Sequence, residues 1–501
     1  MIRKKFEFKL KFAWLAVFLT GMSFFSFGQR ILTIEQALEI AEDNNPSMIA
    51  SKLSLQRTQF NLDAQYAGLK PNFRFTVNPL TYGIGRTFDN YNAAWYTSKE
   101  LSSSGTFRGD MTFLATDATL RFDDTFSWQN KESEKATGTT VNKAFSNRLS
   151  LTLNQPLFTY NRTKMTIQGL EFDKENAGIS YALQRLTQEQ RITRQFYSVY
   201  SAKRTLDIRR AELENAENNY EIIKAKVEAQ LMAEQELLQA QVSLMNARSS
   251  VKQSEVSLQD AKDNLKQMLG MPLNEDIDVE VTIDATPMLI NIENAIQQGM
   301  GSRMELRQRE ISMIDADLQM IRTKANNEFN GNVSLSVGID GDNEQFGNIY
   351  EKTTPSPKVS LSFTIPVFDW GQKRAQINAQ KVSQTVAKLN YDNEVVSIEL
   401  EIRSSVRSLE NYRSELEIQE LTIQGAQRTY ALNEVLYREG DINGLQLSQY
   451  QAQFSSAQLN YVRAQINYKQ ELLNLKILTL YDYENDKPIV PVRELIGVSM
   501  K

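Results

Sequence analysis

Residues 365–374 read Ile-Pro-Val-Phe-Asp-Trp-Gly-Gln-Lys-Arg and separate a short alternating segment from a long run without proline. Part of this stretch occurs earlier in the chain, since Pro156 and Phe158 recur 210 residues later as Pro366 and Phe368. The match keeps this spacing to its end, where residues 264–266, Asn-Leu-Lys, return at 474–476. Such an internal repeat indicates one architecture used twice. A repeat that tolerates no insertion suggests a tube wall in which every helix has one length.

Each half contains a region compatible with a long helical hairpin. No proline occurs between Pro156 and Pro272, or between Pro366 and Pro488. Each half can therefore hold about 70 helical residues, which at 1.5 Å per residue reach roughly 100 Å, followed by about 35 to 45 more. The last helix carries apolar residues at spacings of three and four, the pattern of a coiled-coil seam. A hollow helical tube and a solid soluble coiled coil both fit this pattern.

Four extended segments are predicted at residues 72–80, 147–156, 331–339 and 357–366. The last three alternate apolar residues with small polar ones, which fits a transmembrane barrel strand of about nine to eleven residues. A half-buried sheet is the alternative for any one of them. Four strands cannot close, because a small barrel needs about eight and a bilayer does not tolerate open edges. If these strands span a membrane, several chains must share one barrel.

The first residues read as an export signal. Five basic residues precede an apolar run at residues 12–27, and cleavage is expected after Gly28. A retained signal anchor is the alternative, although the run is shorter than the ~20 residues that a span needs. Removing residues 1–28 takes away five basic residues and one acidic residue, which changes the formal charge from -5 to -9. An exported acidic chain is a poor nucleic-acid binder.

The composition also restricts chemistry. The chain contains no cysteine and no histidine, which excludes disulfides, thiolate metal sites and imidazole acid–base catalysis. No nucleophile–base pair or metal constellation is evident, so we expect neither an enzyme nor a cofactor. Asp340, Asp342, Glu344 and Glu351 have calcium-loop spacing, but Gln345 stands where such a loop requires glycine.

The order of elements and three motifs resemble the TolC-like outer-membrane efflux proteins over essentially the whole mature chain. Residues 32–38 with 44–46 match the family's start, and residues 437–440 followed by Leu445, Leu447 and Gln451 resemble its helical tip. Residues 365–374 resemble its strand-to-helix junction. The junction residues are Pro156, Phe158, Pro366, Phe368, Trp370 and Gly371.

The resemblance implies a homotrimer in which twelve strands cross the outer membrane and twelve helices form a tube across the periplasm. It would be a passive duct of a tripartite efflux or type I secretion system. Its partners would be a periplasmic adaptor (membrane fusion) protein, an inner-membrane pump and outer-membrane lipid. A periplasmic coiled-coil adaptor or scaffold is the alternative function.

The predicted fold class is mainly α: a long helical coiled-coil barrel plus a four-strand contribution to a trimeric transmembrane β-barrel, internally duplicated. After the signal, the first repeat is expected at residues 29–270, a linker at 271–290, the second repeat at 291–480 and an equatorial tail at 481–501. Residues 81–146, rich in aromatic residues, are expected to form a long outward loop with strand extensions; full disorder is the alternative.

The turns of the two hairpins are the predicted functional site. A well-known family member has acidic residues six and nine positions after the second-half tip glycine, and here these positions are Gln446 and Gln449. In the first half, Glu236 stands six positions after Gln230, so three Glu236 carboxylates with Asp441 would form the gate. A solvated capping role is the alternative for Glu236. Adaptor contact is expected at Tyr437, Gly440, Gly444, Leu445 and Leu447.

Overall fold

The structure is a computed structural model of the chain that describes residues 30–90, 93–135, 138–280, 283 and 286–489. The predicted signal peptide lies outside these residues, as does the end of the predicted tail, from residue 490. The described chain divides into two compact units. One comprises residues 30–50, 183–301 and 400–489; the other comprises residues 51–182 and 302–399.

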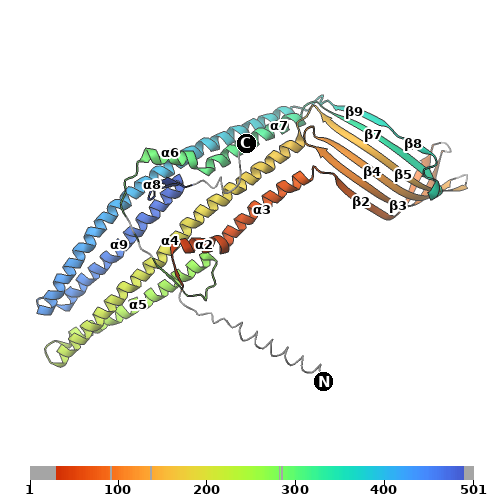
Figure 1. Cartoon of the computed structure of the whole chain (residues 1–501). Helices are drawn as coiled ribbons and strands as arrows, with labels where there is room; N and C mark the ends of the chain where they lie inside the picture. The colour runs from red at the N-terminus through yellow and green to blue at the C-terminus, as the bar shows by residue number, and fades with distance from the viewer. Residues whose placement is uncertain (1–29, 91–92, 136–137, 281–282, 284–285, 490–501) are drawn as a thin grey trace, which may run out of the picture. The chain divides into compact units, whose positions relative to one another are not determined.

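Two helical hairpins contain the longest elements (Figure 1). In the first, α4 (Arg162–Glu228, 67 residues) turns back into α5 (Glu234–Leu269, 36 residues). In the second, α8 (Gln372–Glu439, 68 residues) turns back into α9 (Gly444–Thr479, 36 residues). The prediction of two equal hairpins from the proline spacing is therefore confirmed.

Polar and aromatic contacts join the helices within each hairpin. Arg248 of α5 lies 3.1 Å from Glu217 of α4, and Tyr430 of α8 stacks on Phe454 of α9 with ring centroids 5.8 Å apart. In the first unit the two hairpins also touch each other, since the Gln190 amide donates to Asn474 Oδ1 at 2.9 Å.

A buried cluster closes the open end of the first hairpin. Strand β1 (Arg30–Leu32) pairs in parallel with β6 (Ile277–Val279), and α2 (Ile34–Asn44) follows β1. Leu32, Phe196 and Leu265 are almost fully buried in this cluster. Gly270 ends α5 with φ 70°, and a Cβ there would lie 2.3 Å from the Asn44 carbonyl oxygen. Glycine is therefore required for both its conformation and its lack of a side chain.

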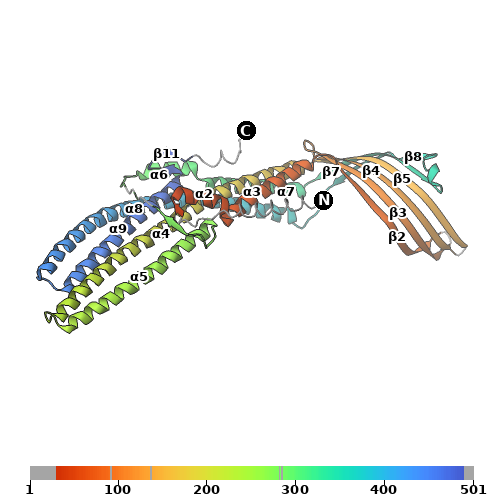
Figure 2. The ribbon, with the colours of Figure 1, turned by 60° about the horizontal axis from the view of Figure 1, so that its bottom comes forward.

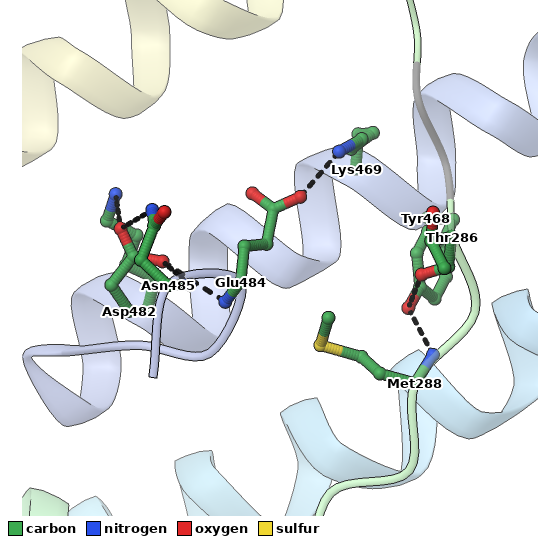
Figure 3. Close-up of polar contacts among 8 residues, drawn as sticks. Thr286, Met288, Tyr468, Lys469, Asp482, Glu484 and Asn485 are labelled. Atoms are coloured by element: carbon green, nitrogen blue, oxygen red, sulfur yellow. Dashed lines mark hydrogen bonds and ion pairs between the residues drawn. The ribbon is translucent and has the colours of Figure 1, made fainter. Parts of the chain in front are cut away.

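The segment after α9 folds back as a small hairpin of β10 (Tyr481–Asp482) and β11 (Lys487–Pro488). Figure 3 shows Asp482 accepting hydrogen bonds from the backbone amides of Glu484 and Asn485. Lys476 lies 2.9 Å from the same carboxylate. Burial alone would raise the pKa of Asp482, but the hydrogen bonds from Lys476 and Asn485 outweigh it and lower the pKa to about 2.

The segment before α6 (Ile292–Ser302) is held on α9 by one tyrosine. Tyr468 is fully buried. Its hydroxyl accepts from the Met288 amide at 3.0 Å and donates to the Thr286 carbonyl oxygen at 3.3 Å (Figure 3). Burial is the main cause that raises the pKa of Tyr468, so this hydroxyl stays protonated and remains a donor.

The second unit contains α3 (Pro46–Ala67, which begins in the first unit), α7 (Met304–Asn326) and the sheet-side parts of α4 and α8. Arg307 of α7 binds both carboxylate oxygens of Glu175 on α4, at 2.7 and 3.2 Å. Arg309 on the same helix pairs with Glu394 of α8 at 2.9 Å. Helix α7 thus bridges α4 and α8. In the described part of the chain, no helix is both long enough and apolar enough to cross a membrane.

One antiparallel sheet completes the second unit (Figure 2). Its order is β2-β3-β4-β5-β7, and β7 then pairs with both β9 and the short β8 (Thr353–Pro355). The other strands are β2 (Asn72–Asp89), β3 (Ala94–Phe113), β4 (Ala118–Lys135), β5 (Gly138–Leu157), β7 (Asn330–Asn343) and the seven-residue β9 (Lys358–Thr364). A 3-10 turn, η1 (Phe346–Asn348), lies between β7 and β8.

The strand count differs from the prediction. All four predicted segments are strands, but residues 81–146 are not a long loop. They form the rest of β2, all of β3 and β4, and the start of β5. Besides the short β8, the sheet therefore contains six strands where the sequence predicted four. Several aromatic residues of this stretch pack on rings of neighbouring strands: Phe88 on Trp95, Phe107 on Phe122, and Phe126 on Phe145.

Candidate functional site at the hairpin turns

The two hairpin turns have the same backbone conformation. Gln230 and Gly440, which are equivalent in the repeat, both have left-handed backbone, with φ 60° and 90°. The next amide closes each helix: Leu231 N–H donates to the Lys226 carbonyl at 2.8 Å, and Asp441 N–H donates to the Leu436 carbonyl at 2.9 Å. This is the Schellman ending of a helix. The turn geometry is thus preserved although the glycine is not.

The two turns differ in how the returning helix begins. Asn443 caps α9: its side chain accepts from the Gln446 amide at 2.9 Å, while Gln446 Oε1 accepts from the Asn443 amide at 3.1 Å. In α5 the equivalent cap residue is Ala233, which makes no side-chain hydrogen bond. The side chain of Gln446, one of the predicted tip residues, is therefore engaged in a capping box.

Close to its turn, the second hairpin packs against α4 of the first hairpin. The Tyr437 hydroxyl of α8 donates to Asn219 Oδ1 of α4 at 2.6 Å, and burial raises the pKa of Tyr437. A Cβ on Gly444 would lie 3.6 Å from the Asn219 side chain and 3.9 Å from Ile223. The start of α9 is therefore packed closely against α4.

A groove of about 550 Å³ lies between the two hairpins near these turns. Four predicted adaptor-contact residues line it: Tyr437, Gly444, Leu445 and Leu447. Leu445 is 58% exposed. Gly440 does not line the groove and keeps its predicted place at the turn itself.

The predicted gate residues are distributed over both turns. Glu236 is exposed, stands at the third position of α5 and lines the groove. Asp441 and Gln449 are exposed and do not line the groove. Glu234 and Glu236 place two carboxylates in the first turn of α5, where the helix dipole stabilises negative charge.

Asn219 and Ile223 are groove residues that the sequence did not single out. They belong to the long helix α4, where a single asparagine among Asn215, Asn218 and Asn219 carries no local signal. Only the pairing with Tyr437 distinguishes Asn219. That contact joins residues 218 positions apart, so no short motif could have predicted it.

The strand-to-helix junctions were also predicted as sites, and both have unusual backbone. Phe158 has φ 56°, and its ring packs on Phe329 with centroids 5.2 Å apart. At the second junction, Trp370 and Gly371 have φ 52° and 87°. Pro156 is paired within β5, opposite Asn332, whereas β9 ends at Thr364, before Pro366. Pro366 thus lies after the end of its strand, whereas Pro156 lies within its strand.

Asp369 begins α8. Its carboxylate accepts from the Lys373 amide at 2.8 Å and the Gly371 amide at 3.0 Å. These backbone hydrogen bonds, with the bond to Lys373 the largest, lower the pKa of Asp369. Beside it Phe368 and Trp370 form an edge-to-face pair and are 71% and 90% exposed. Exposed aromatic pairs of this kind are typical of a membrane–water interface.

Comparisons with known proteins agree with this architecture. The sequence model for "outer membrane efflux protein" matches residues 119–271 and 323–479, one segment in each half of the chain. No curated protein matches the sequence.

Several solved structures share the fold. The CmeC outer membrane channel of Campylobacter jejuni has a TM-score of 0.69 at 14% identity, covering 93% of this chain and 90% of that one. The outer membrane protein VceC of Vibrio cholerae has a TM-score of 0.66 at 12% identity, with 91% and 96% covered. The open MtrE channel of Neisseria gonorrhoeae has a TM-score of 0.64 at 13% identity, with 89% and 88% covered.

Proposed function

This chain belongs to the outer membrane efflux protein family, whose members are channels of the outer membrane, and from this premise we propose that it is the export duct of a tripartite system. Three copies would form the channel. A periplasmic adaptor would bind at the hairpin turns, and an inner-membrane pump would supply the energy. The observation that best supports this proposal is the duplicated hairpin, because the family's sequence model matches once in each half of the chain.

The repeat supports the trimer by its geometry. Each chain has two hairpins of equal length, so three chains provide six hairpins that can surround one lumen. The sheet supports it as well, because an open sheet in a membrane must pair its edges. The alternative of a periplasmic adaptor gains no support, since an adaptor needs neither the second hairpin nor the sheet.

The groove residues support an adaptor contact. Leu445 and Leu447 offer apolar side chains beside Tyr437, and a helical hairpin from a partner would bury them. Glu236 at the same groove provides the acidic group of the proposed gate. Its third position in α5 places it close to the turn, where the channel would be narrowest.

Two measurements test the proposal. Sedimentation in detergent should give a trimer, and reconstituted protein should conduct ions across a planar bilayer. A photo-crosslinking amino acid at Leu445 should capture the adaptor encoded with the same pump, whereas one at Glu417, an exposed α8 position outside the groove, should not. A stable monomer without conductance would refute the duct.

A further inference from the structure

The hairpin of β3 and β4 runs the full height of the sheet between β2 and β5, and relative to the four predicted strands it is an insertion. Strand β3 pairs with β2 from Asn72↔Asp110 to Asp89↔Ala94, with one bulge between Asn78 and Thr81. Strand β4 pairs with β5 from Thr119↔Asn154 to Lys135↔Gly138. Strands β2 and β5, which a four-strand sheet would place side by side, are therefore separated by two complete strands.

The turn between β3 and β4 lies at the helix end of the sheet. The Asp117 carboxylate accepts from the backbone amides of Arg162 and Thr163, at 3.3 and 3.2 Å, where α4 begins. The side-chain amide of Asn161 donates to the Leu114 carbonyl oxygen at 2.6 Å. A flap outside the membrane would not reach this end, so these contacts place the hairpin along the whole sheet.

One face of the inserted hairpin continues the apolar face of its neighbours. The Phe107 ring lies between Phe73 of β2 and Phe122 of β4, at centroid distances of 5.8 and 6.1 Å. The outward row of β4 runs Leu120, Phe122, Phe126 and Trp128, interrupted by Asp124. The Asp124 carboxylate accepts from the Asn147 amide at 2.7 Å, so this polar group is paired. An apolar row about nine residues long is what a lipid-facing strand requires.

The other face of the hairpin is polar and internally paired. Thr106 and Thr125 hydroxyls lie 3.2 Å apart, and Arg108 pairs with Asp123 at 2.5 Å. Asp110 lies 2.8 Å from Arg74 of β2. The same Asp110 lies 2.9 Å from Arg121 of β4. This alternation, apolar on one face and polar on the other, is the pattern of a strand between lipid and a water-filled lumen.

From these observations we infer that the chain contributes six membrane-spanning strands, so that three copies close a barrel of eighteen strands instead of twelve. In the described chain β2 pairs only with β3, and β9 pairs only with β7. The outer edges of β2 and β9 are therefore both open to pairing with another copy of the chain. The six strands are a property of one chain. Their closure into eighteen rests on the proposed trimer.

A barrel diameter grows roughly linearly with strand number, so eighteen strands give a lumen about 1.5 times as wide as twelve, in the range where porins leave an open aqueous channel. The partner of each edge is a second copy of this chain, and the partner of the aromatic face is lipid. The barrel would then admit larger cargo than a twelve-strand barrel. The narrowest part of the channel would lie at the hairpin turns.

Cross-linking within one chain tests the six strands, because the chain has no cysteine of its own. Thr76, Thr106, Thr125 and Arg148 form one row across β2, β3, β4 and β5. At about 4.8 Å between strands, Thr76 and Thr106 are neighbours, whereas Thr76 and Arg148 are about 14 Å apart. A short reagent with two thiol-reactive groups should join the pair T76C/T106C and fail with T76C/R148C. The reverse result would show β2 beside β5 and overturn the inference.

A second measurement asks whether the hairpin lies in the bilayer. A fluorophore on F122C should be quenched by spin-labelled lipid, as on L151C of β5, which serves as the matched control. T125C should instead react with a membrane-impermeant maleimide, as should S150C. An F122C that is unquenched and labelled from water would place the hairpin outside the membrane and overturn the inference.

The oligomeric state separates this inference from the proposed function. A trimer with the T76C/T106C cross-link gives eighteen strands. A trimer with the T76C/R148C cross-link keeps the duct and rejects the insertion. The T76C/T106C cross-link in a protein that is not trimeric keeps six strands per chain and rejects the eighteen-strand closure.

Discussion

Gln230 and Gly440 hold the same left-handed backbone at equivalent turns, yet only one of them is glycine. A side chain in this conformation costs roughly 1 kcal/mol, which glycine avoids. The first hairpin turn is therefore intrinsically less stable than the second, although both end their helices with the same hydrogen bonds.

Exchanging the residues at these two positions should exchange the stabilities of the turns. Gln230→Gly should stabilise the first turn by about 0.5–1 kcal/mol, and Gly440→Gln should destabilise the second by about the same amount. Hydrogen exchange of the turn amides in detergent micelles measures both. Equal protection in all three proteins would show that the turn backbone relaxes away from the left-handed region.

The cap of α9 gives a second test of turn asymmetry. Asn443→Ala removes a side-chain cap and should cost about 1 kcal/mol, which makes the first amides of α9 exchange about five-fold faster. Asn443→Asp keeps the acceptor and serves as the control. The converse change, Ala233→Asn, should protect the start of α5. No change in exchange on Asn443→Ala would mean that tertiary contacts alone hold this helix end.

Much of the helical architecture was predictable from the sequence, because proline spacing and the repeat are local signals. The absence of proline between Pro156 and Pro272 limited the breaks in the first hairpin, and the structure has one turn, at residues 229–233. The predicted sheet segments were found because their signal is also local. Leu149, Leu151 and Leu153 alternate with small polar residues within one strand.

Strand β3 was missed because its apolar face depends on its neighbours. Its outward row includes Gly105 and Gly109, which break the alternation in the sequence. Phe73 of β2 covers Gly109, where a Cβ would lie 2.8 Å from the ring, and Phe75 comes within 3.3 Å of a Cβ on Gly105. The apolar surface is supplied across the strands, so a reading of β3 alone finds a loop rich in serine and glycine.

The contact between Tyr437 and Asn219 should couple the two hairpins. Tyr437→Phe removes the hydroxyl that donates at 2.6 Å, and the loss of one hydrogen bond costs roughly 0.5–1.5 kcal/mol. Exchange at residues 219–223 should rise, and Asn219→Ala should raise it by a similar amount. In a double-mutant cycle the two effects should be less than additive. Strict additivity would show that the contact does not stabilise the groove.

The hairpin after α9 should loosen in acid. The pKa of Asp482 is about 2 in the folded chain, against an ordinary value of 3.8. Its charge therefore stabilises the fold above about pH 4, and this contribution, at most about 2 kcal/mol, is lost as the pH falls towards 2. A spin label at K487C should become mobile over that range. In an Asp482→Asn background the label should be more mobile at pH 6 and should change little between pH 4 and 2.

Ion selectivity tests the proposed gate. Glu236 stands near the turn in the first half, where the repeat has Gln446 in the second. Three Glu236 carboxylates in a narrow throat would attract cations. Glu236→Gln should therefore move the reversal potential of the reconstituted channel in a salt gradient towards zero. Glu234→Gln removes an exposed carboxylate from the same helix turn and should have a smaller effect. Equal shifts would indicate a general surface charge, and an unchanged potential for Glu236→Gln would place this side chain away from the ion path and assign it to the groove alone.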